Sequence, residues 1–127
     1  MEPTTPRRRH SWAAKFGDAL RGLKFGMRGQ SSFAVHAFMA AAVLVAATVL
    51  RCSLEQWALL IFAIGLVFTA ELLNTSIEVL FRGFDEEARE RSWRCLDIAA
   101  AAVFLASATA AAIGILVFGG RIYEMSF

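Results

Sequence analysis

The sequence has 127 residues, of which 57% are hydrophobic, and its mean hydropathy of +0.54 excludes an ordinary soluble domain of this size. The net charge of +2 is uninformative by itself, and neither Cys52 nor Cys95 has metal-ligand spacing around it. Three apolar stretches come close to the length of a bilayer span, so we expect one membrane-embedded unit over residues 1–127.

Residues 1–10 contain both prolines and a run of three arginines. They predict a basic tail that is attracted to the anionic head groups of lipids. Because membrane segments adjoin this tail, we expect a lipid bilayer and no nucleic acid as its partner.

A surface helix is predicted over residues 11–28, where Ser11 suits a helix N-cap. Its apolar residues recur every three or four positions: Trp12, Phe16, Leu20, Leu23 and Met27. Such a helix lies in the membrane interface with its basic side toward water. It is either a simple anchor or a cover that neutralises phosphates above an active site, and the pattern leaves both open.

The first transmembrane helix is predicted over residues 33–50, and His36 lies one turn inside it. A single histidine at such a position is more often a hydrogen-bonded packing residue than a catalyst. We therefore interpret His36 as structural.

The second transmembrane helix, residues 57–81, contains Glu71, Asn74 and Glu78 within an apolar run. Residues three and seven positions apart return to nearly the same helix face, so these side chains form one polar stripe. Acidic groups at membrane depth are costly and mark a functional site, whereas a stripe that only joins helices needs no pair of glutamates. From the helical rise of about 1.5 Å per residue, Glu78 lies about 5 Å and Glu71 about 15 Å from the cytoplasmic end of the helix.

Residues 82–94 form a loop with charges of both signs, which is a solvated surface or part of a site for a charged ligand. The third transmembrane helix follows over residues 98–119. Asp97 before it is either an acid favoured by the helix start or a residue with a direct role. The many alanines of this helix predict close helix packing. Three helices can hardly enclose two glutamates, so we expect oligomerisation.

Eleven of the 13 lysines and arginines lie before the first span or between the second and third, and only Arg51 and Arg121 lie on the other side. The positive-inside rule then places the amino terminus in the cytoplasm and the carboxyl terminus outside. We expect a multi-pass protein of the bacterial inner membrane.

The depths of the two acids suggest different tasks. Glu71 is placed to accept a proton from a hydroxyl in the bilayer, and Glu78, nearer water, suits a Mg²⁺ shared with nucleotide phosphates. Asn74 lies one turn from each and can orient either. The sequence contains no glycine-rich phosphate loop, and a proton-translocating subunit would also use intramembrane acids.

The octet Glu71-Leu72-Leu73-Asn74-Thr75-Ser76-Ile77-Glu78 resembles the signature of the small bacterial membrane diacylglycerol kinase and undecaprenol kinase family. The resemblance extends from about Trp12 to the end of the chain. It implies an all-α fold of three transmembrane helices after an amphipathic surface helix, assembled as a homotrimer with active sites between subunits. It also implies phosphorylation of a lipid alcohol, diacylglycerol or undecaprenol, with ATP and Mg²⁺.

Roles follow from the resemblance position by position. It implies that Glu71 is the catalytic base with Asn74 beside it, and that Glu78 and Gln30 bind the metal. Five positions fall where the family binds ATP: Glu78, Glu87, Ala88, Arg89 and Asp97. Together with Glu71, the surface-helix residues Arg21 and Lys24 are expected at the lipid substrate.

Three positions depart from the family pattern. Gln30 replaces a glutamate, Leu96 replaces a lysine, and Ala34 replaces an arginine two residues before His36. A glutamine oxygen can still coordinate Mg²⁺ but brings no negative charge. These departures leave a second interpretation open, in which the chain is a catalytically degenerate member that binds lipid or acts as a scaffold.

Overall fold

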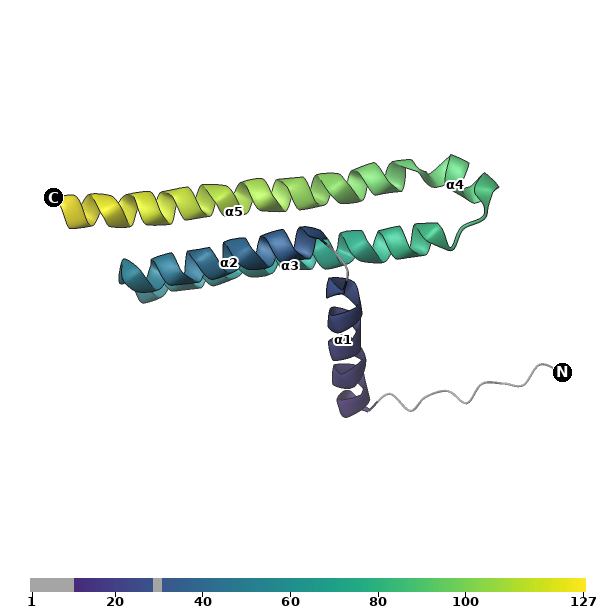
Figure 1. The fold of residues 1–127 in the computed structure, drawn as a ribbon, viewed down its shortest axis with the longest axis horizontal. Coiled ribbons are helices and arrows are strands. Elements are labelled where there is room, and N and C mark those ends of the chain that lie inside the picture. The colour runs from purple at the N-terminus through teal and green to yellow at the C-terminus, as the bar shows by residue number, and fades with distance from the viewer. Residues whose placement is uncertain (1–10, 29–30) are drawn as a thin grey trace.

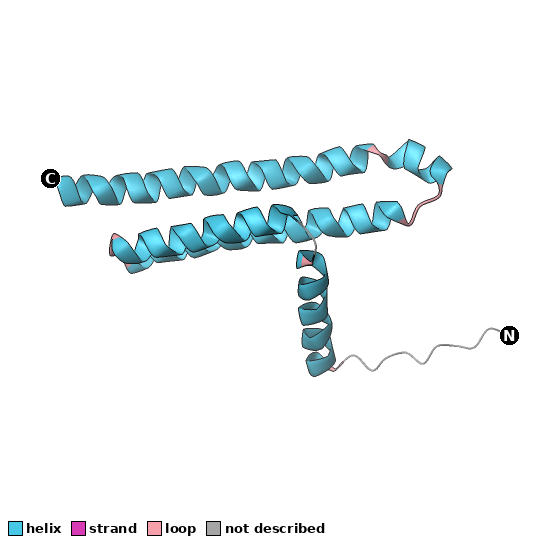
Figure 2. Cartoon of the chain, viewed as in Figure 1, coloured by secondary structure: helices cyan, strands magenta, loops and turns pink. Residues whose placement is uncertain are grey.

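A computed structural model of the chain describes residues 11–28 and 31–127, and every regular element in these ranges is a helix (Figures 1 and 2). The helices are α1 (Trp12–Met27), α2 (Ser31–Val49), α3 (Leu54–Arg82), α4 (Glu86–Ser92) and α5 (Arg94–Ser126). The all-α fold with an amphipathic helix before three membrane helices is confirmed. The basic tail of residues 1–10 and the metal ligand expected at Gln30 lie outside the described residues.

Three of the helices, α2, α3 and α5, are long and apolar enough to cross a membrane. From the helical rise, α2 is about 28 Å long, α3 about 43 Å and α5 about 50 Å. Since the hydrocarbon core of a bilayer is about 30 Å thick, α2 just spans it, whereas α3 and α5 are longer than the core. The end of α3 and the start of α5 project together beyond the level of α1 and hold α4 at their tip (Figure 1).

Short polar side chains begin several of these helices. Ser11 accepts a hydrogen bond from the Ala14 N–H, and Ser53 forms a capping box with Gln56. Asp85 caps α4 by accepting a hydrogen bond of 2.8 Å from the Ala88 N–H. Much of the charged stretch that was predicted as a loop is therefore a short helix.

The helix α3 is the centre of the fold, because it packs against α1, α2 and α5. At the end away from α4, the three spans share a small core of Ala47, Leu60 and Val117. Beside this core, Arg121 Nε of α5 donates a hydrogen bond of 2.8 Å to the carbonyl oxygen of Leu50, just after α2. This bond satisfies a carbonyl that α2 itself leaves unpaired at its end.

Helix α1 runs crosswise to the three spans and meets α3 near the middle of the molecule (Figure 1). Its large apolar side chains, including Trp12, Phe16 and Leu20, are exposed, as expected for a helix in the membrane interface. Only Gly26 of α1 is buried, and a Cβ atom there would lie 2.7 Å from Cδ2 of Leu72. The absence of a side chain at Gly26 therefore permits the close approach of α1 to α3.

The small core gives a prediction for stability. Leu60 is 1% exposed, whereas its neighbour Leu59 on the same helix is 49% exposed. We expect Leu60→Ala to destabilise the folded chain by about 2 kcal/mol, near the low end of the range for buried leucines, because lipid supplies little of the transfer term that water supplies. Thermal unfolding in detergent measures this change. Leu59→Ala is the matched control, and an equal loss in both variants would contradict the packing of this core.

Candidate active site

Glu71 is a buried carboxylate, only 4% exposed, and both of its oxygens are hydrogen-bonded. Its Oε1 lies 2.8 Å from Nε2 of His36, and its Oε2 accepts a bond of 3.3 Å from Oγ of Ser32. Both partners come from α2. Burial of a carboxylate is costly unless it is hydrogen-bonded or paired, so these contacts offset the cost of burying Glu71.

The local packing of α2 against α3 explains why these side chains meet. Ser32 and His36 are four residues apart, so they lie on one face of α2. Between them in the sequence, the buried Phe33 stacks on Phe68 of α3 with a centroid distance of 5.8 Å. Because Phe68 is three residues before Glu71, the aromatic pair fixes the register that brings Ser32 and His36 to the carboxylate.

Asn74 and Glu78 form a second, separate pair on α3. Nδ2 of Asn74 donates a hydrogen bond of 2.9 Å to Oε1 of Glu78, and both residues are half-buried. No hydrogen bond joins Asn74 to Glu71 among the described residues. Asn74 thus orients Glu78, and the polar stripe is divided into a buried acid held by α2 and a more open acid held by its own helix.

The depth of Glu71 in the membrane can also be judged from the place where α1 crosses α3. Leu72, the next residue along α3, is in direct reach of α1 at Gly26. If α1 marks the membrane interface, Glu71 lies at the level of that interface, with protein on all sides, and Glu78 lies in the part that projects past it. A single chain already encloses Glu71, so the argument for oligomerisation from lipid exposure of this residue does not apply.

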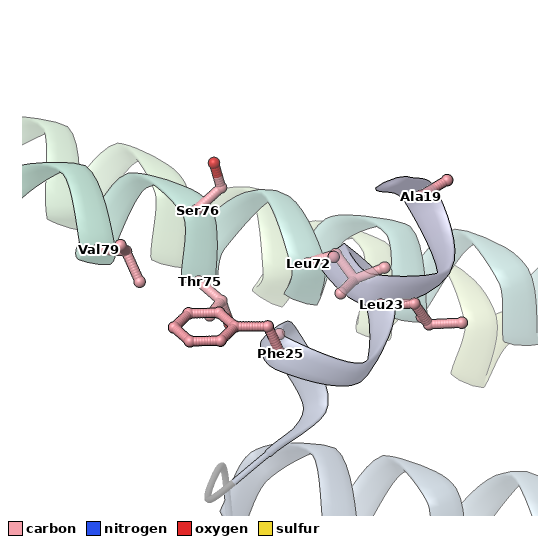
Figure 3. A pocket seen from close by; sticks show the side chains of 9 residues that line it. Ala19, Leu23, Phe25, Leu72, Thr75, Ser76 and Val79 are labelled. Carbon is pink, nitrogen blue, oxygen red and sulfur yellow. The ribbon is translucent and has the colours of Figure 1, made fainter. Parts of the chain in front are cut away.

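A groove of about 540 Å³ lies between α1 and α3 (Figure 3). Nine residues line it: Ala19, Gly22, Leu23, Phe25, Gly26, Leu72, Thr75, Ser76 and Val79. Phe25 lies beneath Thr75 in the close view, and the hydroxyl of Ser76 points away from α1 (Figure 3). The lining is mostly apolar, and two of its residues, Leu72 and Thr75, follow Glu71 by one and four residues along α3. They therefore lie within about one helical turn of Glu71 on that helix.

The residues expected to bind a nucleotide lie at the projecting end of the fold. Glu87 pairs with Arg91 at 3.5 Å, and both side chains are largely exposed. Arg89 donates a hydrogen bond of 2.6 Å from Nη2 to the carbonyl oxygen of Arg82, where it caps the end of α3. Asp97 is exposed in the first turn of α5. These residues share one end of the molecule with Glu78, but within the described ranges none of them forms a hydrogen bond or ion pair with it.

The residues expected at the lipid substrate are not brought together. Arg21 pairs with Asp18 on the exposed side of α1. Lys24 lines a second, smaller groove on α1 with Leu20, Leu23, Met27 and Arg28. In the described part of the chain, neither basic residue contacts Glu71.

Sequence reasoning missed the two partners of Glu71. No sequence motif marks Ser32 as a site residue, and a single histidine such as His36 is typical of a packing residue. Their spacing of four residues on one face of a membrane helix was the available signal, because two polar groups on such a face need a partner. The helix that supplies this partner is fixed only by the tertiary packing.

The chain is similar in sequence to known membrane kinases. The sequence model of a family described as prokaryotic diacylglycerol kinase matches residues 17–118. An undecaprenol kinase from Bacillus subtilis is 32% identical over 103 residues, which cover 81% of this chain and 84% of that protein. A diacylglycerol kinase from Synechocystis sp. is 31% identical over 116 residues, which cover 86% of this chain and 66% of that protein. No solved structure matches the chain significantly.

Proposed function

The chain belongs to the prokaryotic diacylglycerol kinase family and is therefore a lipid kinase of the bacterial membrane, and from this premise we propose that it transfers the γ-phosphate of ATP to a primary hydroxyl of diacylglycerol or undecaprenol. The resemblance noted for residues 71–78 is thereby confirmed. The observation that supports the proposal most is the buried carboxylate of Glu71, whose neighbours Leu72 and Thr75 on α3 line an apolar groove. We further propose a homotrimer with its amino terminus in the cytoplasm and its carboxyl terminus outside.

In the proposed reaction Glu71 is the general base. The lipid hydroxyl gives its proton to a carboxylate oxygen of Glu71 while its oxygen forms a bond to the γ-phosphorus. The bond between the γ-phosphorus and the oxygen that bridges to the β-phosphate breaks, and its electron pair leaves with ADP. Positioning and charge stabilisation supply most of the catalysis in phosphoryl transfer, so the fixed orientation of Glu71 is the important property of this site.

Glu78 and Asn74 have the oxygen donors that Mg²⁺ prefers. With Oε1 of Glu78 bonded to the Asn74 amide, Oε2 of Glu78 and Oδ1 of Asn74 have no other partner among the described residues. No group of three or more acidic, histidine or cysteine side chains that could hold a metal occurs in those ranges. Mg²⁺ is commonly bound by one or two protein carboxylates together with phosphates and water. A bound Mg²⁺ would neutralise charge on the phosphates.

The nucleotide is proposed to lie at the projecting end, near Glu78. Glu87, Ala88 and Arg89 of α4, and Asp97 of α5, are available there. Because Arg89 already binds the carbonyl of Arg82, its first effect is to fix α4 against α3. The proposed role of Gln30 as a further metal ligand stays a prediction.

The groove between α1 and α3 is proposed to hold the apolar part of the lipid next to its hydroxyl. Its apolar lining suits hydrocarbon, and its lining residues Leu72 and Thr75 are close to Glu71 along α3, which supports a lipid hydroxyl near the base. Arg21 and Lys24 on α1 would then face lipid head groups in the interface. An apolar groove of this kind accepts acyl and prenyl chains alike.

The groove gives a testable prediction at Gly26. We expect Gly26→Leu to raise KM for the lipid by about tenfold, because the new side chain fills the groove or pushes α1 away from Leu72. KM for ATP should change little. Gly17→Leu on the same helix is the control, since a Cβ atom there meets nothing within 4 Å. Equal KM values for the lipid in the two variants would show that the groove is not part of the substrate site.

The activity is tested by incubating membranes that contain the protein with labelled ATP, Mg²⁺, and either diacylglycerol or undecaprenol. We expect label in one lipid phosphate well above the level of membranes without the protein. No transfer to either lipid would contradict the proposed substrates.

A degenerate scaffold is the alternative suggested by Gln30 and Leu96. The double variant Gln30→Glu with Leu96→Lys distinguishes it in the same assay. Activity that appears only in the double variant would favour the scaffold, whereas activity in the unmodified chain excludes it.

A further inference from the structure

Building on the proposed lipid kinase function, we propose that His36 is a positioning residue that holds Oε1 of Glu71, so that Oε2 receives the lipid proton. In this arrangement the hydroxyl of Ser32 occupies the place of the lipid hydroxyl until the substrate displaces it. His36 thus favours the reaction by positioning the carboxylate of Glu71, whereas Ser32 competes with the substrate for it.

The two hydrogen bonds to Glu71 differ in length. The contact between His36 Nε2 and Glu71 Oε1 is 2.8 Å, which is typical of a strong hydrogen bond to a carboxylate. The contact between Ser32 Oγ and Glu71 Oε2 is 3.3 Å, which is long for a hydroxyl donor. The bond at Oε2 is therefore the weaker one and the easier one to exchange for a substrate.

The two donors to Glu71 differ in chemistry. An ionised carboxylate only accepts hydrogen bonds, so Nε2 of His36 is assigned as the N–H donor when Glu71 is the base. Ser32 is a primary alcohol, the same chemical group as the lipid acceptor. Its oxygen marks a place from which an alcohol can donate to Oε2 of Glu71.

Ser32 and His36 also differ in how easily each can withdraw from Glu71. Ser32 can withdraw its hydroxyl by a rotation about one side-chain bond, and it is only half-buried. His36 is half-buried as well, but to withdraw it a whole ring must move and the shorter of the two bonds to Glu71 must break. Ser32 is therefore the partner of Glu71 that is easier to displace.

The test compares kcat and KM for the lipid in three variants. His36→Gln keeps an N–H donor near the position of Nε2, whereas His36→Met has a similar size and no donor. We expect kcat to fall about tenfold or more in His36→Met and to recover largely in His36→Gln, because loss of one hydrogen bond to a charged group costs about that factor. A purely structural role predicts no recovery by the donor.

Ser32→Ala is expected to change the kinetics in the other direction. Since the substrate no longer has to replace a hydrogen bond, KM for the lipid should fall about threefold or more. A tenfold loss of kcat in Ser32→Ala would overturn the assignment of Oε2, and this measurement does not depend on any His36 variant. Equal kcat values for His36→Gln and His36→Met would overturn the positioning role.

Failure of this inference is distinct from failure of the proposed function. If the unmodified protein transfers no more label than Glu71→Gln, the proposed base is wrong and the inference falls with it. If the unmodified protein is active but His36→Gln and His36→Met have equal kcat values, or Ser32→Ala does not lower KM for the lipid, only the roles of His36 and Ser32 are wrong.

Discussion

Glu71→Gln is expected to lower kcat for lipid phosphorylation by about 10²–10⁴-fold, the usual contribution of a general base. Glutamine has nearly the same shape, so the packing of α3 against α2 should persist. Its amide can still bond to one of the partners, His36 or Ser32, but it cannot accept the proton of the lipid hydroxyl. KM for ATP should change little, because Glu71 is separate from the pair that is proposed to face the nucleotide. Single-turnover transfer of labelled phosphate measures the effect.

The matched control is Glu55→Gln at the start of the same helix. Glu55 is exposed near the opposite end of α3, so its loss changes the charge of α3 without changing the site. If Glu71→Gln keeps more than about a tenth of the normal kcat, a general base at this position is excluded.

Glu78→Gln is expected to raise the Mg²⁺ concentration needed for half-maximal activity by about tenfold or more, because the substitution removes the negative charge from the proposed ligand. The loss should be partly restored by excess Mg²⁺, which Glu71→Gln should not show. Titration of activity against Mg²⁺ at saturating lipid measures this difference.

Asn74→Ala is expected to raise the Mg²⁺ concentration needed for half-maximal activity, but less than Glu78→Gln does. It removes a neutral oxygen donor and the hydrogen bond of 2.9 Å that orients Glu78, while the carboxylate stays in place. Glu55→Gln again serves as the control for a lost carboxylate. An unaltered Mg²⁺ titration in Glu78→Gln would show that the metal binds elsewhere.

Sequence reasoning was weakest in the charged segment between the second and third spans. Charge runs have no apolar periodicity, so this segment was predicted as a loop. The structure places α4 there, begun by the Asp85 cap and joined to α3 by Arg89 on the carbonyl of Arg82. The cap was readable in the sequence, but the contact between Arg89 and Arg82 depends on the turn that connects the two helices.

The polar stripe shows a second limit. Helical spacing correctly places Glu71, Asn74 and Glu78 on one side of α3, but it assigns no partner to any of them. The structure joins Asn74 to Glu78 and leaves Glu71 to α2. Which side chains pair depends on their rotamers and on the neighbouring helix, and helical spacing gives information on neither.

The sequence by itself determined the number of spans, the surface helix before them and the two acids in an apolar run, because these follow from local composition and helical periodicity. The tertiary structure decided that Ser32 and His36 hold Glu71 and that a groove forms between α1 and α3, with Leu72 and Thr75 in its lining. Both depend on how far one helix is shifted along another. That register is set by contacts between residues distant in the chain, Phe33 on Phe68 and Gly26 on Leu72.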